Sequence, residues 1–288
     1  MPALFRLVFL LLAALLFSTP LARADDAPKV LVTIAPIHSL VARVMEGVGT
    51  PDLLVRGAAS PHGMALKPSD AQKLERAGLV IRIGPQMEGF LNHALMKNDP
   101  TRVLTLMAAP GIVLLDDDPH IWLSPTNAAA MTNAIAERLA QIDPANRARY
   151  TANAAVTRQD IVHLQSRMTK ELASVKGRPF VVFHDAYRYF EHAFALKNQG
   201  RVFAMTDRQP GAAHIQTLIR LMRAKAIPCL FTEPQFAPDL AFVIASETGA
   251  RTGVLDPLGA ALVPGPELYF QLMEQNARTL TACLNPDG

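Results

Sequence analysis

The chain has 288 residues, of which 50% are apolar and 18% are charged, so it can bury a sizeable core and is not a disordered chain. This length suits two domains of ordinary size or one large one. Without residues 1–24 the 28 basic residues become 26 against 25 acidic ones. They form no dense run, so nothing indicates nucleic acid as a partner.

Residues 1–24 have the pattern of a cleavable signal peptide. Arg6 precedes an unbroken apolar run at 7–17, and the sequence Ala-Arg-Ala at 22–24 is a small-x-small cleavage site. The apolar run is too short to span a membrane, and no Cys at the cleavage site could carry a lipid. We therefore expect an exported, periplasmic protein that begins near Asp25 and has no membrane anchor.

Short β-rich runs alternate with helical patterns along the rest of the chain. One helix is indicated by a capping box at 69–72, and another by the spacing of Met131, Ile135, Leu139 and Ile142. Alternating short strands and helices predict an α/β fold with parallel sheets that helices cover on both faces. The predicted strands are 30–34, 53–55, 79–83, 103–106, 112–115, 180–183, 229–232 and 252–255.

The segment at 144–176 predicts one long helix. After Pro144, which suits the first turn of a helix, it has no Gly, no further Pro and no β-rich run. A helix of roughly 30 residues spans about 45 Å, enough to connect two lobes. We therefore predict an α/β lobe at 25–143, a connecting helix at 144–176 and a second α/β lobe at 177–288.

Cys229 and Cys283 are the only thiols of the chain. In an oxidising compartment an even pair is most simply a disulfide, which would tie the C-terminal segment to the strand at 229–232. The alternative is a thiolate metal site, but two distant thiols without a CxxC motif are a poor zinc signature.

Four polar side chains lie at or beyond the ends of predicted strands. His184 and Asp256 directly follow such strands, and His62 and His120 lie in loops that come after earlier ones. Ligands bind beyond the carboxyl ends of parallel strands, so all four could meet between the lobes. Three imidazoles and one carboxylate suit zinc, whereas Mg²⁺ and Ca²⁺ prefer oxygen ligands. The alternative is a set of histidines that bridge the lobes through hydrogen bonds to backbone groups.

Several motifs follow one another along nearly the whole mature chain. They are Ser-Pro-His at 60–62 with Leu-Lys-Pro-Ser-Asp at 66–70, His-Ile-Trp-Leu-Ser-Pro at 120–125, Phe-His-Asp-Ala-Tyr at 183–187, Thr-Glu-Pro-Gln at 232–235 and Leu-Asp-Pro-Leu-Gly at 255–259. Together they resemble the periplasmic zinc-binding proteins of high-affinity zinc uptake ABC transporters, within the metal-binding solute-receptor family. The resemblance implies two α/β lobes joined by one long helix, with the metal site in the cleft between the lobes.

The resemblance also implies a ligand set and a function. It places metal ligands on His62, His120 and His184, with Asp256 at the position of a carboxylate ligand. Relatives that carry manganese tend to have a carboxylate at the third position, so His184 favours zinc. The implied function is capture of Zn²⁺ in the periplasm and its delivery to the membrane permease of an ABC transporter. We expect a monomer that is not an enzyme.

The sequence departs from the family pattern in two places. Zinc receptors often carry a long loop rich in His and acidic residues before the second His ligand. Here only the three Asp at 116–118 precede His120, and we interpret them as a solvated loop. Some members have a Glu directly before the first ligand, where this chain has Pro61. The fourth ligand is then Asp256 or a water molecule, and we favour Asp256.

Two further residues are candidates for contacts around the ligands. Glu233 follows a strand, and we expect it to orient a ligand His through the second ring nitrogen or to form a bare salt bridge. His38 follows the first strand, and we expect it beside the site or at the start of a helix.

Two alternative functions are a periplasmic zinc buffer or chaperone with the same site, and a zinc hydrolase in which three His hold a zinc ion with a bound water and Glu233 is the base.

Overall fold

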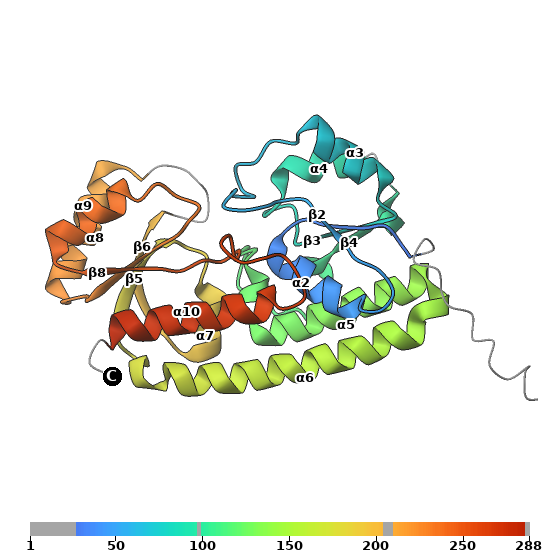
Figure 1. The fold of residues 1–288 in the computed structure, drawn as a ribbon. Coiled ribbons are helices and arrows are strands. Elements are labelled where there is room, and N and C mark those ends of the chain that lie inside the picture. The colour runs from blue at the N-terminus through green and yellow to red at the C-terminus, as the bar shows by residue number, and fades with distance from the viewer. Residues whose placement is uncertain (1–26, 97–98, 204–209, 286–288) are drawn as a thin grey trace, which may run out of the picture.

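Two four-stranded sheets, each parallel throughout, form the framework of the protein. The computed structural model describes residues 27–96, 99–203 and 210–285, so the predicted signal peptide lies outside the described residues. The two sheets lie side by side along the molecule, above one long helix in the view of Figure 1. The predicted α/β fold is thereby confirmed.

The strand order is β2-β1-β3-β4 in the first sheet and β6-β5-β7-β8 in the second. The first sheet consists of β1 (Val30–Val32), β2 (Asp52–Leu53), β3 (Leu79–Arg82) and β4 (Val103–Thr105). The second consists of β5 (Pro179–His184), β6 (Lys197–Phe203), β7 (Cys229–Thr232) and β8 (Arg251–Val254). The α-helices are α2 (Ala35–Val44), α3 (Pro68–Arg76), α4 (Asn92–Leu95), α5 (Pro125–Ile142), α6 (Arg147–Glu171), α7 (Arg188–Phe194), α8 (Ala212–Ala224), α9 (Asp239–Thr248) and α10 (Leu268–Leu284). Short 3₁₀ turns are η2 (Gly89–Leu91), η3 (Pro100–Arg102), η4 (Leu106–Ala108), η5 (Ile121–Leu123), η6 (Pro144–Asn146) and η7 (Leu172–Val175).

The central strands are apolar on both faces because helices cover each face. In β5, Val181 and Phe183 pack into a cluster with residues of α8 and α9. Phe180 and Val182, which point to the opposite face, join the large core that includes α10. This alternation follows from the two-residue period of a strand, and it sends the last residue of β5, His184, toward the space between the two sheets.

One predicted strand is wrong, and one strand of the structure was not predicted. The segment at 112–115 is an irregular loop, in which Asn127 pairs with both backbone groups of Val113 and the Tyr189 hydroxyl accepts the N–H of Leu115. These side chains satisfy backbone groups that a neighbouring strand would otherwise pair. Conversely, β6 was not predicted, because it is an edge strand whose first residues are polar and only partly buried.

The segment predicted as the connecting helix is helical from 144 to 175. It begins with η6, continues as α6 and ends with η7. The apolar side chains of its buried stripe include Tyr150, Ile161, Leu164 and Met168, and they face α2, α5 and α10. In Figure 1 α6 runs beneath both sheets, so it is placed to fix the distance between them. The boundaries of the two predicted lobes stay a prediction.

A second connection crosses between the two halves of the molecule. The start of α10 packs against α2, where the Ser39 hydroxyl donates to the Pro266 carbonyl oxygen at 2.8 Å and accepts the N–H of Tyr269 at 3.0 Å. The indole N–H of Trp122, which is fully buried, donates to the Pro257 carbonyl oxygen at 2.7 Å. The segment before α10 is therefore held to residues of the first half of the chain.

The predicted disulfide is present. Cys229, the first residue of β7, is bonded to Cys283 in the last turn of α10.

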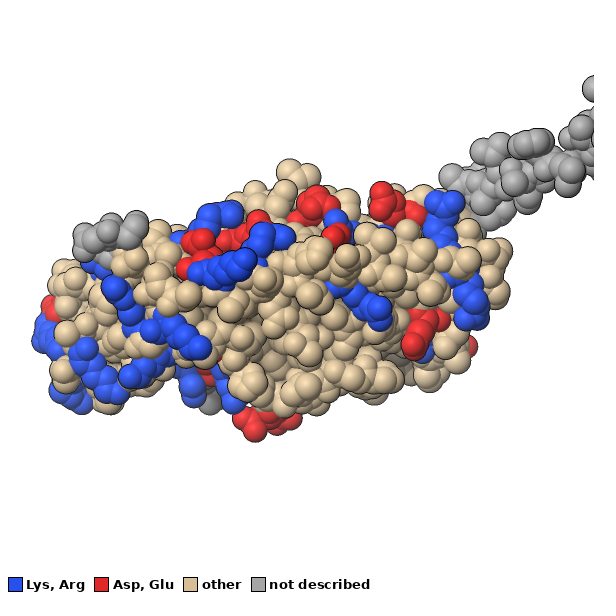
Figure 2. Space-filling view, turned by 90° about the horizontal axis from the view of Figure 1, so that it is seen from below, with Lys and Arg blue, Asp and Glu red and all other residues tan. Residues whose placement is uncertain are grey.

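Among the described residues, none of the helices combines the length and the apolar character that a membrane span requires. Seen from the side of α6, Lys and Arg are most numerous at the end of the molecule that the second sheet forms, and acidic residues are interspersed along the rest (Figure 2).

Candidate metal centre

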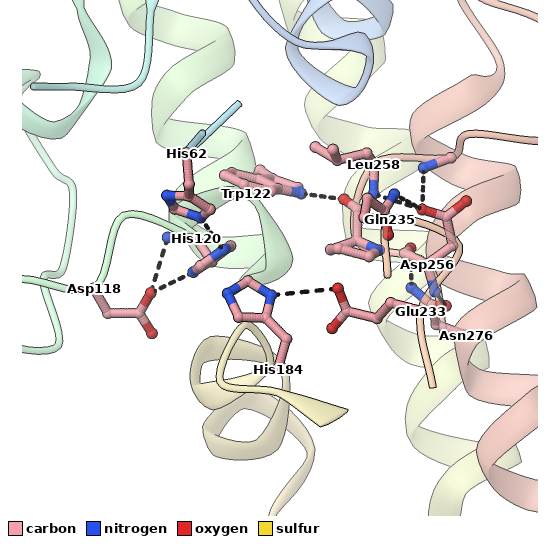
Figure 3. A network of polar contacts seen from close by, with 12 residues as sticks. His62, Asp118, His120, Trp122, His184, Glu233, Gln235, Asp256, Leu258 and Asn276 are labelled. Atoms are coloured by element: carbon pink, nitrogen blue, oxygen red, sulfur yellow. Dashed lines mark hydrogen bonds and ion pairs between the residues drawn. The ribbon is translucent and has the colours of Figure 1, made fainter. Parts of the chain in front are cut away.

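Three histidines from separate parts of the chain converge between the two sheets (Figure 3). His184 is the last residue of β5, and His120 directly precedes η5. His62 lies in the loop between β2 and α3. The first two belong to well-packed segments and are 3% and 2% exposed, whereas His62 is partly exposed. The positions of His184 at the end of β5 and of His62 after β2 agree with the rule for open parallel sheets, whereas His120 lies in an irregular segment after η4.

The spacing of the ring nitrogens fits a single small ion. One nitrogen from each of His62, His120 and His184 lies within 4.8 Å of the other two. The Nε2 atoms of His62 and His120 are 3.3 Å apart. Two nitrogens that each lie 2.0–2.1 Å from a tetrahedral zinc ion are about 3.4 Å apart. The pair therefore has the separation that a shared zinc ion requires.

The histidines line a very small pocket. Its free volume is about 10 Å³, and residues of the first half of the chain, including Pro61 and Trp122, face Phe236 and Leu258 of the second half. A space of about 10–15 Å³ holds one water molecule. An ion that enters this pocket must therefore lose most of its hydration shell, and the imidazole nitrogens replace the lost water.

A carboxylate of the first half of the chain holds the ring of His120. Asp118 Oδ1 lies 2.8 Å from His120 Nδ1 and accepts the backbone N–H of His120 at 3.0 Å. Asp118 is fully buried. With Nδ1 engaged, the ring presents Nε2 to the centre, an arrangement typical of metal-binding histidines. The interpretation of all three Asp at 116–118 as a solvated loop is wrong for Asp118, because its side chain turns inward to these two donors.

A carboxylate of the second half of the chain lies against His184 in the same way. Glu233 Oε2 is 3.3 Å from His184 Nδ1, and Glu233 is 4% exposed. Glu233 comes directly after β7, which neighbours β5 in the sheet. The structure thus places Glu233 beside a histidine ring, at the position expected from the sequence, and leaves His184 Nε2 facing the centre in Figure 3.

Burial sets the protonation of these groups. It lowers the pKa of His120 well below its usual value, and the neighbouring His184 lowers it further, because a second positive charge would be repelled. Burial raises the pKa of Asp118 to about 6, against the opposing effect of its hydrogen bond with the N–H of His120. Burial also raises the pKa of Glu233, which His184 opposes. At pH 7.5 His120 is therefore neutral and Asp118 is ionised. A neutral imidazole can bind a metal ion, and an ionised carboxylate can accept a hydrogen bond that orients the ring.

Asp256 has other partners in this structure. Its Oδ1 accepts N–H groups from Leu258, Gly259 and the Gln235 side chain, each at 3.0 Å. The converging group of donors in the described residues contains the three histidines and not this carboxylate. Its place as fourth ligand stays a prediction, and the hydrogen bonds give it a second role, which is to shape the loop that follows β8.

His38 is buried but stands apart from the three converging rings. Its Nε2 lies 3.0 Å from the Pro51 carbonyl oxygen, and burial lowers its pKa. It sits within α2 and braces the segment before β2. Sequence reasoning missed Asp118 as a partner of His120, and it also missed Phe236, whose ring lies beside that of His184. For Asp118 the available signal was its position two residues before a candidate ligand histidine, where an Asp side chain can reach the N–H of that residue.

Residues 30–283 match the family described as zinc-uptake complex component A, periplasmic. The chain belongs to this family. It is 35% identical to the high-affinity zinc uptake system protein ZnuA of Brucella suis, over 91% of this chain and 93% of that protein. Among solved structures, a crystal structure of ZnuA has 27% identity and a TM-score of 0.80 and covers 90% of this chain and 100% of that chain. A ZnuA deletion mutant with zinc bound has 26% identity and a TM-score of 0.78, with 90% and 98% covered.

Proposed function

We propose that this protein captures Zn²⁺ in the periplasm and delivers it to the membrane permease of an ABC transporter. The observation that carries the proposal is the convergence of three imidazoles, from three separate loops and strand ends, on one point. The family and its zinc-uptake relatives support the same function. Zn²⁺ is the transported ion here, so the site must hold it firmly and also release it.

The proposed ligands are His62, His120 and His184, the last two through Nε2. Their Nδ1 atoms face Asp118 and Glu233, which fixes each ring so that the other nitrogen meets the ion. Neutral imidazoles bind Zn²⁺ well, whereas Mg²⁺ and Ca²⁺ prefer oxygen ligands. Two buried carboxylates beside the rings offset the charge of the dication in a pocket of low polarity.

The fourth ligand of the ion depends on the hydrogen bonds within the loop after β8. We propose that a water molecule takes it while Asp256 keeps its hydrogen bonds to Leu258 and Gly259. Ligation through Oδ1 would compete with those N–H groups, and ligation through Oδ2 would compete with the N–H of Ala260, which donates to that oxygen. The zinc hydrolase alternative needs Glu233 as a free base, but its Oε2 lies against His184. A monomeric receptor in the periplasm remains our expectation.

A combined binding and uptake experiment tests the function. The purified mature chain is loaded with zinc, and the bound zinc is counted by elemental analysis before and after chelation. A strain without this gene is then grown under zinc chelation with the wild-type gene or the His184→Ala variant, in the presence or absence of the permease. We expect one zinc per chain, growth with wild type only when the permease is present, and no rescue by the variant. Rescue that does not depend on the permease would instead favour the buffer alternative.

A further inference from the structure

We propose that Phe236 selects the transported ion, because its ring, together with that of Trp122, fills the space beside the histidines and limits the ion to four ligands. The inference deepens the proposed function and rests on it, since it names the class of ion that the site accepts. That class is the divalent ions that are stable with four ligands, such as Zn²⁺. Ions that prefer six ligands, such as Mn²⁺, are bound more weakly than their charge alone would allow.

Each of the two buried histidines has an aromatic ring beside it. The ring centroids of Trp122 and His120 are 5.3 Å apart, and both rings line the pocket. The ring centroids of Phe236 and His184 are 5.4 Å apart, and both rings line the pocket as well. The indole N–H of Trp122 already donates to the Pro257 carbonyl oxygen, and a phenyl ring carries no polar atom. Neither aromatic ring therefore offers the ion a ligand atom.

The free space beside the histidines decides how many ligands the ion can have. It is about 10 Å³, which is the space of one water molecule. An ion that three imidazoles bind needs one further ligand to complete a tetrahedral shell and three to complete an octahedral one. One small ligand fits in this space, and three do not. The pocket therefore suits the tetrahedral shell that is usual for zinc.

The ring of Phe236 is held firmly, so the wall of the pocket does not yield to a larger ligand shell. It packs against the ring of Phe183 in β5 at 5.6 Å and against that of Phe203, the last residue of β6, at 5.4 Å. The backbone N–H of Phe236 donates to the Glu233 carbonyl oxygen at 3.3 Å, which closes a turn after β7. A shift of the ring that admits more water would disrupt packed contacts with two neighbouring strands.

Of the two aromatic rings, that of Phe236 is the one to remove. Trp122 is fully buried, and its substitution would disturb the core, whereas Phe236 is only partly buried. Phe236→Ala makes room for further water molecules on the ion, and Phe236→Leu keeps an apolar group at the same place. The matched control is Phe242→Ala, which removes a phenyl ring that is 58% exposed on α9 and does not line the pocket.

The test measures the choice between two ions and the number of ligands separately. Wild type and the three variants are titrated with Zn²⁺ and with Mn²⁺ in competition with a chelator, and the ratio of the Kd for Mn²⁺ to the Kd for Zn²⁺ is compared. Co²⁺ is then bound in place of zinc, because its visible absorption is strong with four ligands and weak with six. Thermal unfolding of the metal-free proteins checks that each variant is folded.

We expect the Kd ratio to fall by about tenfold or more in Phe236→Ala, because the apolar shell of a metal site controls the access of water to the ion. The Co²⁺ absorption of this variant should weaken as water molecules are added to the ion. Phe236→Leu and Phe242→Ala should keep the wild-type ratio within about threefold and the strong Co²⁺ absorption. A ring that only stabilises the fold would, when removed, weaken the binding of both ions alike and leave their ratio unchanged.

An unchanged ratio in Phe236→Ala, or a fall of the same size in Phe242→Ala, would overturn the proposal. A weak, six-coordinate Co²⁺ spectrum of the wild-type protein would overturn it even if Phe236→Ala does not fold. Absence of zinc from the wild-type protein after loading, measured by elemental analysis, would instead refute the proposed function.

Discussion

Substitution of Asp118 by Asn tests whether a buried carboxylate sets the zinc affinity. The side chain is fully buried, and Oδ1 lies within hydrogen-bonding distance of the backbone N and Nδ1 of His120. Asn has nearly the same shape, and its amide oxygen can still take both contacts, so His120 keeps its place. What is lost is the negative charge that increases the basicity of the ring and offsets the charge of the ion.

The size of the effect follows from these contacts. A hydrogen bond to a charged group contributes about 1.5–3 kcal/mol, and loss of a carboxylate partner of a metal-binding His typically lowers metal affinity by about 10–100-fold. The expected rise in the Kd for zinc therefore corresponds to about 1.4–2.7 kcal/mol. Measurement at pH 7.5 is suitable because burial raises the pKa of Asp118 only to about 6, so the wild-type carboxylate is ionised.

The assay is competition for zinc with a chromophoric chelator, and Asp116→Asn is the matched control. Asp116 lies two residues away, is 81% exposed and pairs with Arg188 at the surface. Its substitution should change the Kd by less than about twofold. Thermal unfolding of both metal-free variants checks that the fold is intact. Equal affinities for Asp118→Asn and wild type, or equal losses in the two variants, would refute the role assigned to Asp118.

Three further predictions concern stability and the ligand set. Burial raises the pKa of Glu191 to about 7, above the 4.5 of the unfolded chain, so the ionised group costs stability above pH 7 and this cost disappears as the pH falls to about 4.5. Glu191→Gln, which can still accept from Asn198, should raise the free energy of unfolding by up to about 3 kcal/mol at pH 8 and by nothing near pH 4.5, in urea titrations. Replacement of both disulfide cysteines by Ala should cost about 4 kcal/mol and leave the zinc Kd within about threefold, because the bond lies at the far end of β7 from Glu233. His62→Ala should weaken zinc binding at least about 100-fold, whereas His214→Ala, whose ring contacts the Arg201 carbonyl oxygen, should not change it.

The sequence predicts the fold well where strands are buried. The runs that became β1, β3, β5 and β7 are apolar on both faces, so composition alone marks them. The edge strand β6 has polar, partly exposed residues and gives no such signal. The opposite error at 112–115 arose because an apolar run can also be a loop whose backbone groups bond to side chains such as Asn127 and Tyr189.

The candidate site was predicted by position and by the family motifs. His184 ends β5 and His62 follows β2, and the ends of parallel strands lie at one edge of a sheet. His120 was placed from a predicted strand at 112–115 that is a loop, so for this residue the family motif was the better guide. A local sequence motif does not predict the direction in which a side chain points. Asp118 is one of three adjacent acids in the sequence, and only its contacts with His120 distinguish it from the other two. Asp256 accepts N–H groups of its own loop, a role that its place after a strand does not indicate, and its place as fourth ligand stays a prediction.

Diffraction from crystals of the zinc-loaded protein, measured on both sides of the zinc absorption edge, tests the central claim most directly. The anomalous difference map locates the ion without reference to the chain. We expect one peak per molecule, about 2.0–2.1 Å from a ring nitrogen of each of His62, His120 and His184. A peak at another place, or one that leaves any of the three rings unbound, would contradict the account.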